Sequence, residues 1–250
     1  GGFNSNSGGI SINDIAVQND GKIIVGGSFD VYNGNLLNNI ARLNPDGSLD
    51  QSFLTGLGFG PDNYGPRVVN TICLQTDGKI IVGGNFMEYN GIPTFNIVRL
   101  NPDGIVDQNF SSGSGFDGYI NTLSVNTAGK IIVGGAFSIY NGNSTNCVIQ
   151  LNDDGTIDSG FNIGFGPDGI VKTIAIQSNG SLLVGGDFAN FNGTSRNKIT
   201  RLSPTGTNDP SFNIGSGISG ISFPTVNRIV IQPDGIIGVA GQFSNYNGTS

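Results

Sequence analysis

A block of 23 residues occurs five times along the chain, and this repetition restricts the possible folds more than any other feature. One glycine of the block recurs at positions 26, 83, 134 and 185 and is alanine at 240, so consecutive units are offset by 51 to 57 residues. Self-similarity at such a period indicates a repeat architecture. The copies are INDIAVQNDGKIIVGGSFDVYNG at 12–34, VNTICLQTDGKIIVGGNFMEYNG at 69–91, INTLSVNTAGKIIVGGAFSIYNG at 120–142, VKTIAIQSNGSLLVGGDFANFNG at 171–193 and VNRIVIQPDGIIGVAGQFSNYNG at 226–248.

A second block follows the first in four of the units, and the fifth unit reaches Ser250 before it. Gly2-Phe3-Asn4 resembles the end of this block at Gly160-Phe161-Asn162. We therefore expect a single repeat domain over 1–250 that is part of a longer array or lacks part of one blade. The second block reads NIARLNPDGSLDQSF at 39–53, NIVRLNPDGIVDQNF at 96–110, CVIQLNDDGTIDSGF at 147–161 and KITRLSPTGTNDPSF at 198–212. The predicted units are 12–68, 69–119, 120–170, 171–225 and the incomplete 226–250.

The first block has the pattern of two β-strands joined by a tight turn. Ile15 and Val17 alternate with the small Ala16 and are followed by Asp-Gly, which favours a two-residue hairpin turn. The run from Lys22 to Phe29 is almost continuously apolar, as in a strand covered on both faces. Its glycine pair indicates either close approach of a neighbouring sheet or a β-bulge.

The second block predicts a third strand that ends at an Asn-Pro-Asp-Gly turn, and a short fourth strand from Leu49 to Phe53. No segment has a sustained helical period. One such unit is too thin to bury both faces of its sheet, so copies must stack on one another. We therefore predict an all-β fold, a β-propeller of about five tandem repeats with three to four strands per blade. An open β-solenoid is the alternative, because periodicity alone does not show closure.

Charge and composition exclude several classes of function. The net charge is −7 with only 11 Lys and Arg and no basic cluster, which argues against nucleic acid and anionic membranes as partners. The sequence has no histidine, which excludes Ser-His-Asp and Cys-His catalysis and histidine metal sites. We predict no enzymatic activity and no cofactor. A carboxylate pair for glycoside hydrolysis stays open as an alternative, although Glu88 is the only Glu.

Two cysteines and several glycine-rich and acidic motifs have structural interpretations. Cys73 and Cys147 occupy different repeat columns and are expected to be unpaired. Three G-x-G-x-x-G matches lie in loops that lead into strands, so we do not expect a nucleotide site; they span 113–118, 164–169 and 215–220. The carboxylate pairs Asp46/Asp50, Asp103/Asp107 and Asp154/Asp158 predict turn capping, with calcium as an alternative. Arg42, Arg99 and Arg201 are expected to pair with nearby carboxylates.

The Tyr-Asn-Gly turns are the candidate ligand-binding positions. Exposed aromatic rings and asparagine amides at these turns can stack on and hydrogen-bond sugars, and one site per blade allows several weak contacts to act together. The alternative is that the aromatic rings cover the apolar edge of each blade, as the Phe29 column does. The candidates are Tyr32, Asn33, Tyr89, Asn90, Tyr140, Asn141, Tyr246 and Asn247.

Both blocks together resemble a known family. Asp-Gly-Lys-Ile-Ile-Val-Gly-Gly-x-Phe followed by Arg-Leu-Asn-Pro-Asp-Gly-x-x-Asp-x-x-Phe is similar to the delta-60 repeat of bacterial secreted and surface proteins. Ala128, Gln150 and Thr205 depart from this pattern, so a ligand role shared by their columns is not expected.

The resemblance implies a β-propeller at the bacterial cell surface or in secreted form. Its expected role is a non-enzymatic structural, adhesion or protein-interaction module. Its expected partners are other domains of a larger chain or a surface or secretion assembly, and glycans are a further possibility. A lectin-like propeller or a component of a phage appendage are the alternatives.

Overall fold

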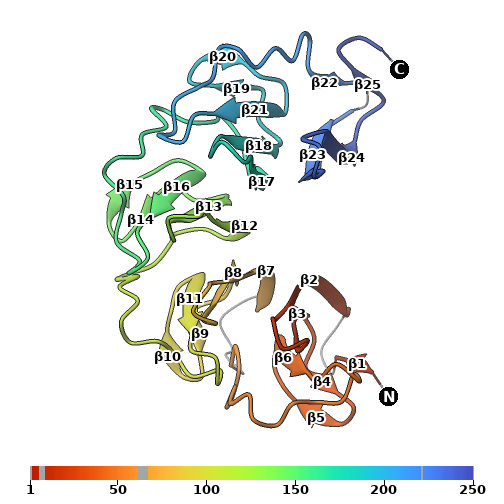
Figure 1. Ribbon diagram of the computed structural model, residues 1–250, viewed down its shortest axis with the longest axis vertical. Coiled ribbons are helices and arrows are strands. Elements are labelled where there is room, and N and C mark those ends of the chain that lie inside the picture. The colour runs from red at the N-terminus through yellow and green to blue at the C-terminus, as the bar shows by residue number, and fades with distance from the viewer. Residues whose placement is uncertain (1, 6–8, 61–66, 221, 250) are drawn as a thin grey trace.

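The computed structural model describes residues 2–5, 9–60, 67–220 and 222–249, and within them the chain is all-β without a helix. Gly1 and Ser250, the limits of the predicted repeat domain, lie outside the described residues. Small twisted sheets follow one another around an arc (Figure 1). The sheets formed by the longer strands are the blades of a β-propeller, as predicted from the repeats.

Among the described residues, four blades have three antiparallel strands and the fifth has two. The strands are β2 (Ser11–Val17), β3 (Ile23–Ser28) and β6 (Ile40–Leu43) in the first blade, β7 (Val68–Leu74), β8 (Ile80–Asn85) and β11 (Ile97–Leu100) in the second, β12 (Ile120–Val125), β13 (Ile131–Gly135) and β16 (Val148–Leu151) in the third, β17 (Val171–Ile176), β18 (Leu182–Gly186) and β21 (Ile199–Leu202) in the fourth, and β23 (Thr225–Ile231) and β24 (Ile237–Gln242) in the fifth. The first strand of each blade is innermost, as expected for a propeller (Figure 1).

A second set of very short strands lies beside the blades and contains the Tyr-Asn-Gly turns. In the first copy, β1 (Phe3–Asn4) pairs with β4 (Val31–Tyr32), which pairs with β5 (Asn35–Leu36). The later copies are β9 (Glu88–Tyr89) with β10 (Ile92–Pro93), β14 (Ile139–Tyr140) with β15 (Asn143–Ser144), β19 (Asn190–Phe191) with β20 (Thr194–Ser195), and β22 (Ile218–Ser219) with β25 (Asn245–Tyr246).

The predicted fourth strand is wrong in its extent. It is reduced to a single bridge between Leu43 and Leu49, and the same bridge recurs in the next three blades. Asp50 causes the strand to end, because its carboxylate accepts the Ser52 N–H at 3.0 Å and its carbonyl accepts the Phe53 N–H at 3.2 Å. The chain therefore turns immediately after the bridge.

The glycine pair is required by two different close approaches. A Cβ on Gly26 would lie 2.4 Å from Cγ1 of Val69 in the next blade, and one on Gly27 would lie 2.0 Å from the carbonyl oxygen of Ser11 in its own blade. The β-bulge lies on the inner strand instead, where the register shifts between Ile12 and Asp14. Close approach is therefore the reason for the glycine pair, and the bulge belongs to the strand opposite it.

Consecutive blades are joined by apolar packing and by hydrogen bonds between their inner strands. Ile81 of the second blade packs in one cluster with Ile120 and Leu123 of the third. The Ile72 N–H donates to Asp14 Oδ2 at 2.7 Å, and the equivalent Leu123 N–H donates to Thr71 Oγ1 at 3.2 Å. The core thus consists of similar layers between blades rather than of one central cluster.

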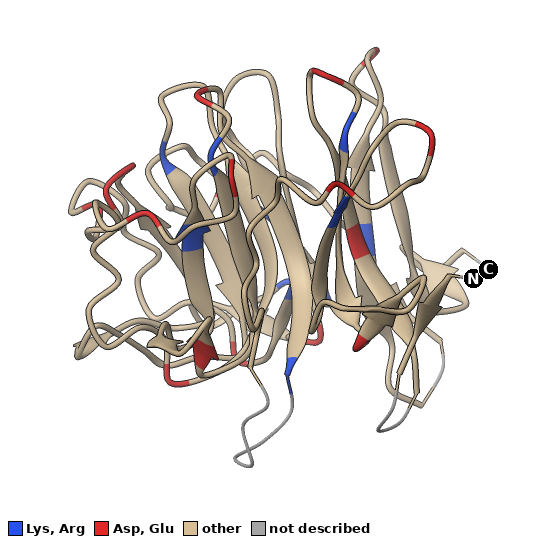
Figure 2. Cartoon of the chain, turned by 90° about the horizontal axis from the view of Figure 1, so that it is seen from below, with Lys and Arg blue, Asp and Glu red and all other residues tan. Residues whose placement is uncertain are grey.

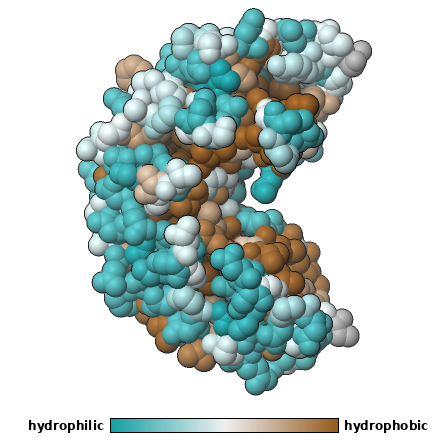
Figure 3. All heavy atoms as spheres, viewed as in Figure 1, coloured by the Kyte–Doolittle hydropathy of each residue, from teal (hydrophilic) through white to brown (hydrophobic). Residues whose placement is uncertain are grey.

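The arc is open between the first and fifth blades. Both termini lie on this open side, and the space-filling view shows hydrophobic residues bordering the gap (Figures 1 and 3). Ile15 and Val17 of β2 are 56% and 63% exposed, whereas Ile72, the counterpart of Ile15, is 7% exposed. The difference arises because no blade precedes the first one among the described residues.

The interpretation of Gly2-Phe3-Asn4 as the end of a second block is wrong. The Phe3 ring lies 4.6 Å from the rings of both Phe29 and Tyr32. Phe116 has the same two neighbours in the third unit, Phe137 and Tyr140. The segment therefore corresponds to Gly115-Phe116-Asp117, in the loop between units. Gly-Phe occurs both in this loop and at the end of the second block, so only the neighbouring rings tell the two positions apart.

Charged residues lie mainly in the loops at the ends of the strands, and the strands themselves contain few (Figure 2). Among the described residues, no helix is long and apolar enough to cross a membrane.

Candidate functional site

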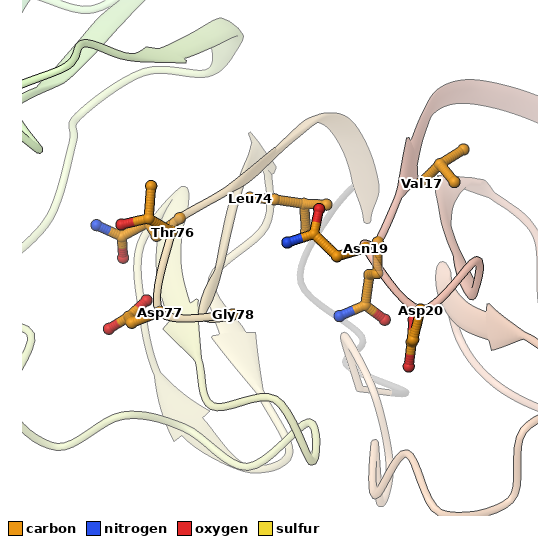
Figure 4. A pocket seen from close by; sticks show the side chains of 9 residues that line it. Val17, Asn19, Asp20, Leu74, Thr76, Asp77 and Gly78 are labelled. Carbon is orange, nitrogen blue, oxygen red and sulfur yellow. The ribbon is translucent and has the colours of Figure 1, made fainter.

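A hollow of about 600 Å³ lies between the first and second blades, where their inner hairpins turn. It is lined by the end of β2 and the following turn and by the equivalent segment after β7 (Figure 4). The tight Asp-Gly turns bring these segments side by side, because each turn reverses the chain at the same level of its blade. The lining residues are Val17, Gln18, Asn19, Asp20, Leu74, Gln75, Thr76, Asp77 and Gly78.

The acidic groups of this hollow are committed to their own turns. Asp20 Oδ1 accepts the Lys22 N–H at 3.1 Å, and Asp77 Oδ1 accepts the Lys79 N–H at 3.1 Å. Figure 4 shows that the Asp20 and Asp77 carboxylates do not converge on a common point. The hollow therefore does not bring these two carboxylates together as a pair.

Two further hollows repeat on the outer side of the arc, and we call them the rim grooves. The first, of about 320 Å³, is lined by Thr94, Val98 and Phe110 among others, and the second, of about 340 Å³, by the equivalent Thr145, Ile149 and Phe161. In each groove, apolar side chains of the third strand meet a polar inter-repeat loop.

Sequence reasoning missed the rim grooves, because their loop walls vary between units. Ser111 and Asn162 occupy the same repeat column in these walls, directly after Phe110 and Phe161. The only available signal was the recurrence of the phenylalanine that ends the second block. The variable residues after it give no pattern from which a groove can be predicted.

The expectation that the candidate tyrosines are exposed is wrong for two of the four. Tyr89 and Tyr140 are fully buried, and their hydroxyls donate to the carbonyls of Gly104 at 2.8 Å and Gly155 at 2.6 Å. Burial raises the pKa of both phenols well above the ordinary value. These rings cover the apolar edge of the blade and present no face to a sugar. Tyr32 is half-buried, and Tyr246 is 47% exposed.

The candidate asparagines fasten the turns to the neighbouring loop. Asn90 Oδ1 accepts the Leu57 N–H at 3.1 Å, and Asn141 Oδ1 accepts the Ser114 N–H at 3.3 Å. Asn33 and Asn247 accept the N–H groups of Gly2 and Ser216 at 2.6 and 3.1 Å. All four have φ between 46° and 51°, a region that asparagine tolerates better than most residues. Their position thus has a structural cause, and ligand binding by them stays a prediction.

The same contacts explain the G-x-G-x-x-G matches. A Cβ on Gly113 would lie 2.0 Å from Asn141 Oδ1, and one on Gly118 would lie 2.0 Å from the carbonyl oxygen of Ala136. The segment leads into strand β12, as expected from its position between repeats. Close packing against the fastened turn therefore accounts for these glycines.

The arginine column forms ion pairs with the second aspartate of the block, as predicted. Arg42 Nε lies 2.7 Å from Asp50 Oδ2, Lys22 Nζ lies 2.9 Å from the same oxygen, and the guanidinium lies 4.7 Å from the centre of the Phe53 ring. Burial opposes ionisation of Asp50, but hydrogen bonds from Lys22, Ser52 and Arg42 outweigh it and hold its pKa well below the ordinary value.

These ion pairs also join neighbouring blades. Arg42 donates to the carbonyl of Pro102 in the second blade, and Arg99 donates to that of Asp153 in the third. Arg99 and Arg201 make the same ion pair in their own blades, with Asp107 at 2.8 Å and Asp209 at 2.7 Å. The column therefore has a structural role.

The first aspartate of the block caps its turn, as Asp46 does by accepting the Ser48 N–H at 2.9 Å. No group of three or more acidic or cysteine side chains that could hold a metal ion occurs within the described ranges. Cys73 and Cys147 are free thiols, and burial raises the pKa of Cys73 to about 11.

A family model described as the domain of unknown function (DUF5122) beta-propeller matches residues 18–53, 75–110, 129–161 and 177–212. The chain belongs to this family. In each of four units the match runs from the hairpin turn of the first block to the end of the second block, so the DUF5122 repeat is the delta-60 type of repeat that the sequence resembles. No curated protein matches the DUF5122 chain.

Solved structures similar to the DUF5122 chain are propellers of varied function. The WD40 β-propeller domain of Doa1 has a TM-score of 0.57 at 13% identity, with 93% of this chain and 60% of that chain covered. PorZ, a surface component of the type-IX secretion system of Porphyromonas gingivalis, has a TM-score of 0.51 at 17% identity, with 94% of this chain and 32% of that chain covered. A gluconolactonase of Xanthomonas campestris has a TM-score of 0.51 at 15% identity, with 92% of this chain and 69% of that chain covered. At these identities the similarity shows the fold alone. The chain spans about a third of PorZ.

Proposed function

We propose that this DUF5122 propeller is a non-enzymatic binding module for adhesion or protein interaction in a secreted bacterial surface protein. The recurrence of an equivalent rim groove in consecutive blades carries the proposal. Equivalent grooves at a regular spacing suit a partner that is itself extended or repetitive, because weak contacts at each groove then add along one molecule. The bacterial surface location rests on the resemblance to delta-60 repeat proteins.

The chemistry of the grooves supports an uncharged or weakly polar polymer segment. Their floors are apolar, with Val98 and Ile149 buried, and their walls are hydroxyl, amide and backbone groups. Arg99 and Asp107 border the first groove but are paired with each other at 2.8 Å. A segment with alternating apolar and polar side chains fits this lining, since it can bury one side and hydrogen-bond with the other.

The test uses a library of extended peptides displayed on phage, selected against the whole 250-residue chain. Ser111→Trp and Asn162→Trp place a large ring at equivalent walls of the two grooves. Each variant is expected to weaken binding of a selected peptide array, and the double variant is expected to weaken it by more than either alone. Ser48→Trp, in the Asn-Pro-Asp-Gly turn of the first blade, is the matched control.

Equal binding by the wild-type chain, both single variants and the double variant would contradict the groove assignment. Steady hydrolysis of a glycoside or lactone by the wild-type chain would contradict the non-enzymatic role. Thermal unfolding of each variant shows that a loss of binding is not a loss of fold.

Carbohydrate binding is a second proposal, and the partial exposure of Tyr246 favours it. A glycan array probed with the wild-type chain and with Tyr246→Ala tests it. Binding that is lost in the variant supports a stacking role for this ring. Silence of the wild-type chain across the array removes the proposal.

A further inference from the structure

Phe165 lines the second rim groove although it is almost fully exposed. Its exposed fraction is 89%, whereas Phe161, which lines the same groove, is half-buried. A single exposed apolar side chain needs no functional explanation by itself. The loop that presents Phe165 and the groove beside it therefore decide whether the ring has a role. The same loop position holds Leu57, Ser114 and Ser216 in the other units.

The loop around Phe165 is fixed by hydrogen bonds on both sides of the ring. Asn146 Nδ2 donates to the Phe165 carbonyl at 2.6 Å, and the Gly166 N–H donates to Asn192 Oδ1 at 2.9 Å. The Asn192 N–H and Nδ2 donate back to the carbonyls of Gly166 at 2.9 Å and Ile163 at 2.7 Å. A ring on a backbone that is already ordered loses less conformational entropy when a ligand packs on it.

The second rim groove is lined by no charged residue within the described part of the chain. Its floor contains the buried Ile149, and the rings of Phe161 and Phe165 contribute to its lining. The first rim groove differs, because Arg99 and Asp107 belong to its lining. The second groove therefore suits an uncharged segment that packs apolar groups on rings and offers polar groups to amides and hydroxyls.

Asn162 supplies a hydrogen-bond donor to the same groove. Its Oδ1 accepts the Gly164 N–H at 2.8 Å, which fixes the side-chain amide. Its Nδ2 has no hydrogen-bond partner among the described residues. Because an amide NH₂ group donates and does not accept, it is suited to a carbonyl oxygen of a ligand.

The outer edge of β16, beside this groove, is already hydrogen-bonded. The Gln150 carbonyl accepts the Asp158 N–H at 3.0 Å, and the Val148 carbonyl accepts Thr145 Oγ1 at 3.3 Å. A peptide that added a regular strand here would have to displace these bonds. A polyproline II segment forms no ladder, and every third residue lies on the same side of it. Such segments bind in grooves lined by aromatic rings.

We propose that the second rim groove binds an uncharged, proline-containing polypeptide segment in the polyproline II conformation. A proline ring packs on Phe165, and Asn162 Nδ2 donates to a carbonyl of the segment. The segment is already extended before it binds, so little conformational entropy is lost on docking. This assignment rests on the proposed binding function and names the ligand class for one of its two grooves.

The test measures binding of labelled, uncharged peptides to the whole chain by fluorescence anisotropy. The probe has roughly twelve residues in repeats of Pro-Ser-Ala, which place a proline at every third position. Its matched control has valine in place of each proline, because valine favours a β-strand. We expect saturable binding of the proline peptide and at least about tenfold weaker binding of the valine peptide.

Variants of the exposed ring locate the site. Phe165→Ala is expected to weaken the proline peptide by at least about tenfold, because the ring is lost while the loop keeps its backbone bonds. Phe165→Tyr is expected to retain binding, because the ring is still present. Phe223→Ala is the matched control: it removes a ring that is 90% exposed in the loop before β23, and the affinity is expected to stay unchanged.

A second pair of variants tests the amide donor. Asn162→Asp keeps an acceptor for the Gly164 N–H and removes the NH₂ group, so it is expected to weaken the proline peptide by roughly tenfold. Asn213→Asp is the matched control, since Asn213 Oδ1 accepts the Gly215 N–H at 2.9 Å in the equivalent loop. It is expected to leave the affinity unchanged. Thermal unfolding of every variant confirms that it remains folded.

Three results would overturn the assignment. The first is no binding of the proline peptide at about 1 mM, and the second is equal or tighter binding of the valine peptide. The third is unchanged binding in both Phe165→Ala and Asn162→Asp. A glycan that binds the wild-type chain and not Phe165→Ala, while the proline peptide does not bind, would assign the ring to a carbohydrate instead.

The proposed binding function is judged separately. If display selection yields proline-free peptides that Asn162→Trp weakens, the grooves bind peptides and only the polyproline assignment fails. If no displayed peptide binds the chain at all, the binding function fails together with the assignment.

Discussion

Gly185 lies directly beneath Val226 of the next blade, so close that an added Cβ would be 2.6 Å from Val226 Cγ1. The same relationship joins Gly26, Gly83 and Gly134 to the blade that follows each of them. In the fifth blade the column holds Ala240, which is exposed because no further blade packs on it within the described residues. The glycine is thus a requirement of the interface between blades and not of the strand.

This relationship predicts stability losses of different size for two single-methyl changes. Gly185→Ala is expected to destabilise the chain by about 1–3 kcal/mol, because the methyl group overpacks the interface against Val226 and Ile229. Ala240→Gly is expected to cost less than about 1 kcal/mol, the strand penalty of glycine alone. Urea unfolding of both variants measures the two free energies, and a loss at Ala240 as large as at Gly185 would contradict the explanation.

In one cross-strand pair of the fifth blade, the large and the small residue stand on opposite strands from those in the fourth blade. Ala175 pairs with Leu183 in the fourth blade, whereas Val230 pairs with Gly238 in the fifth. Leu183 is fully buried against the fifth blade, so Leu183→Ala is expected to cost about 2–5 kcal/mol. Val230 is 51% exposed, so Val230→Ala is expected to cost much less. The two variants are compared by their urea midpoints; similar losses would show that the free face is covered in solution.

Tyr140→Phe tests the structural interpretation of the Tyr-Asn-Gly turns. Phe191 stands in this column in the fourth blade and is fully buried, so the ring without the hydroxyl is already accommodated once. The substitution is expected to cost about 1 kcal/mol through the lost hydrogen bond to the Gly155 carbonyl. Thermal unfolding measures the loss. Unchanged stability combined with altered glycan binding would instead favour a ligand role for Tyr140.

Stability is expected to fall in acid because the paired aspartates titrate. The folded-state pKa values of Asp50, Asp107 and Asp158 are lowered from the ordinary 3.8. A lowered folded pKa means that the stabilisation is complete above the unfolded value and is lost as the pH falls below about 4. With no histidine in the sequence, stability is expected to be flat from about pH 5 to 8. Urea unfolding as a function of pH checks this profile; a midpoint that drops between pH 7 and 5 would contradict it.

Cys73 is expected to react slowly with thiol reagents while the chain is folded. Burial raises its pKa to about 11, so only about one molecule in a thousand carries the thiolate at pH 8. Colourimetric titration with an aromatic disulfide should show slow modification of the native chain and rapid reaction of both cysteines in denaturant. Rapid modification of Cys73 in the native chain would indicate that the interface between the second and third blades opens.

Much of the blade could be predicted from the sequence, because strand, turn and glycine columns repeat and each copy supports the others. The same columns could not show whether an aromatic residue is exposed. Tyr89 is covered by Phe59, with ring centres 4.9 Å apart, and Phe59 lies in an inter-repeat loop that varies between units. The sequence gives the wrong position for the Phe3 segment for the same reason, because the rings that Phe3 contacts, Phe29 and Tyr32, are known only from the structure. The rim grooves are likewise formed by variable loops against a repeated strand.

The hydrogen bond from Arg42 to the Pro102 carbonyl runs from one blade to the blade that follows it in the sequence. The second and third blades each contribute a carbonyl to the arginine of the blade before them, so removal of either blade uncovers a guanidinium on its N-terminal neighbour. Stability in such an array depends on nearest neighbours. Loss of the third blade therefore removes a contact of Arg99 in the second, and loss of the second removes one of Arg42 in the first, so this contact transmits damage only towards the N-terminus.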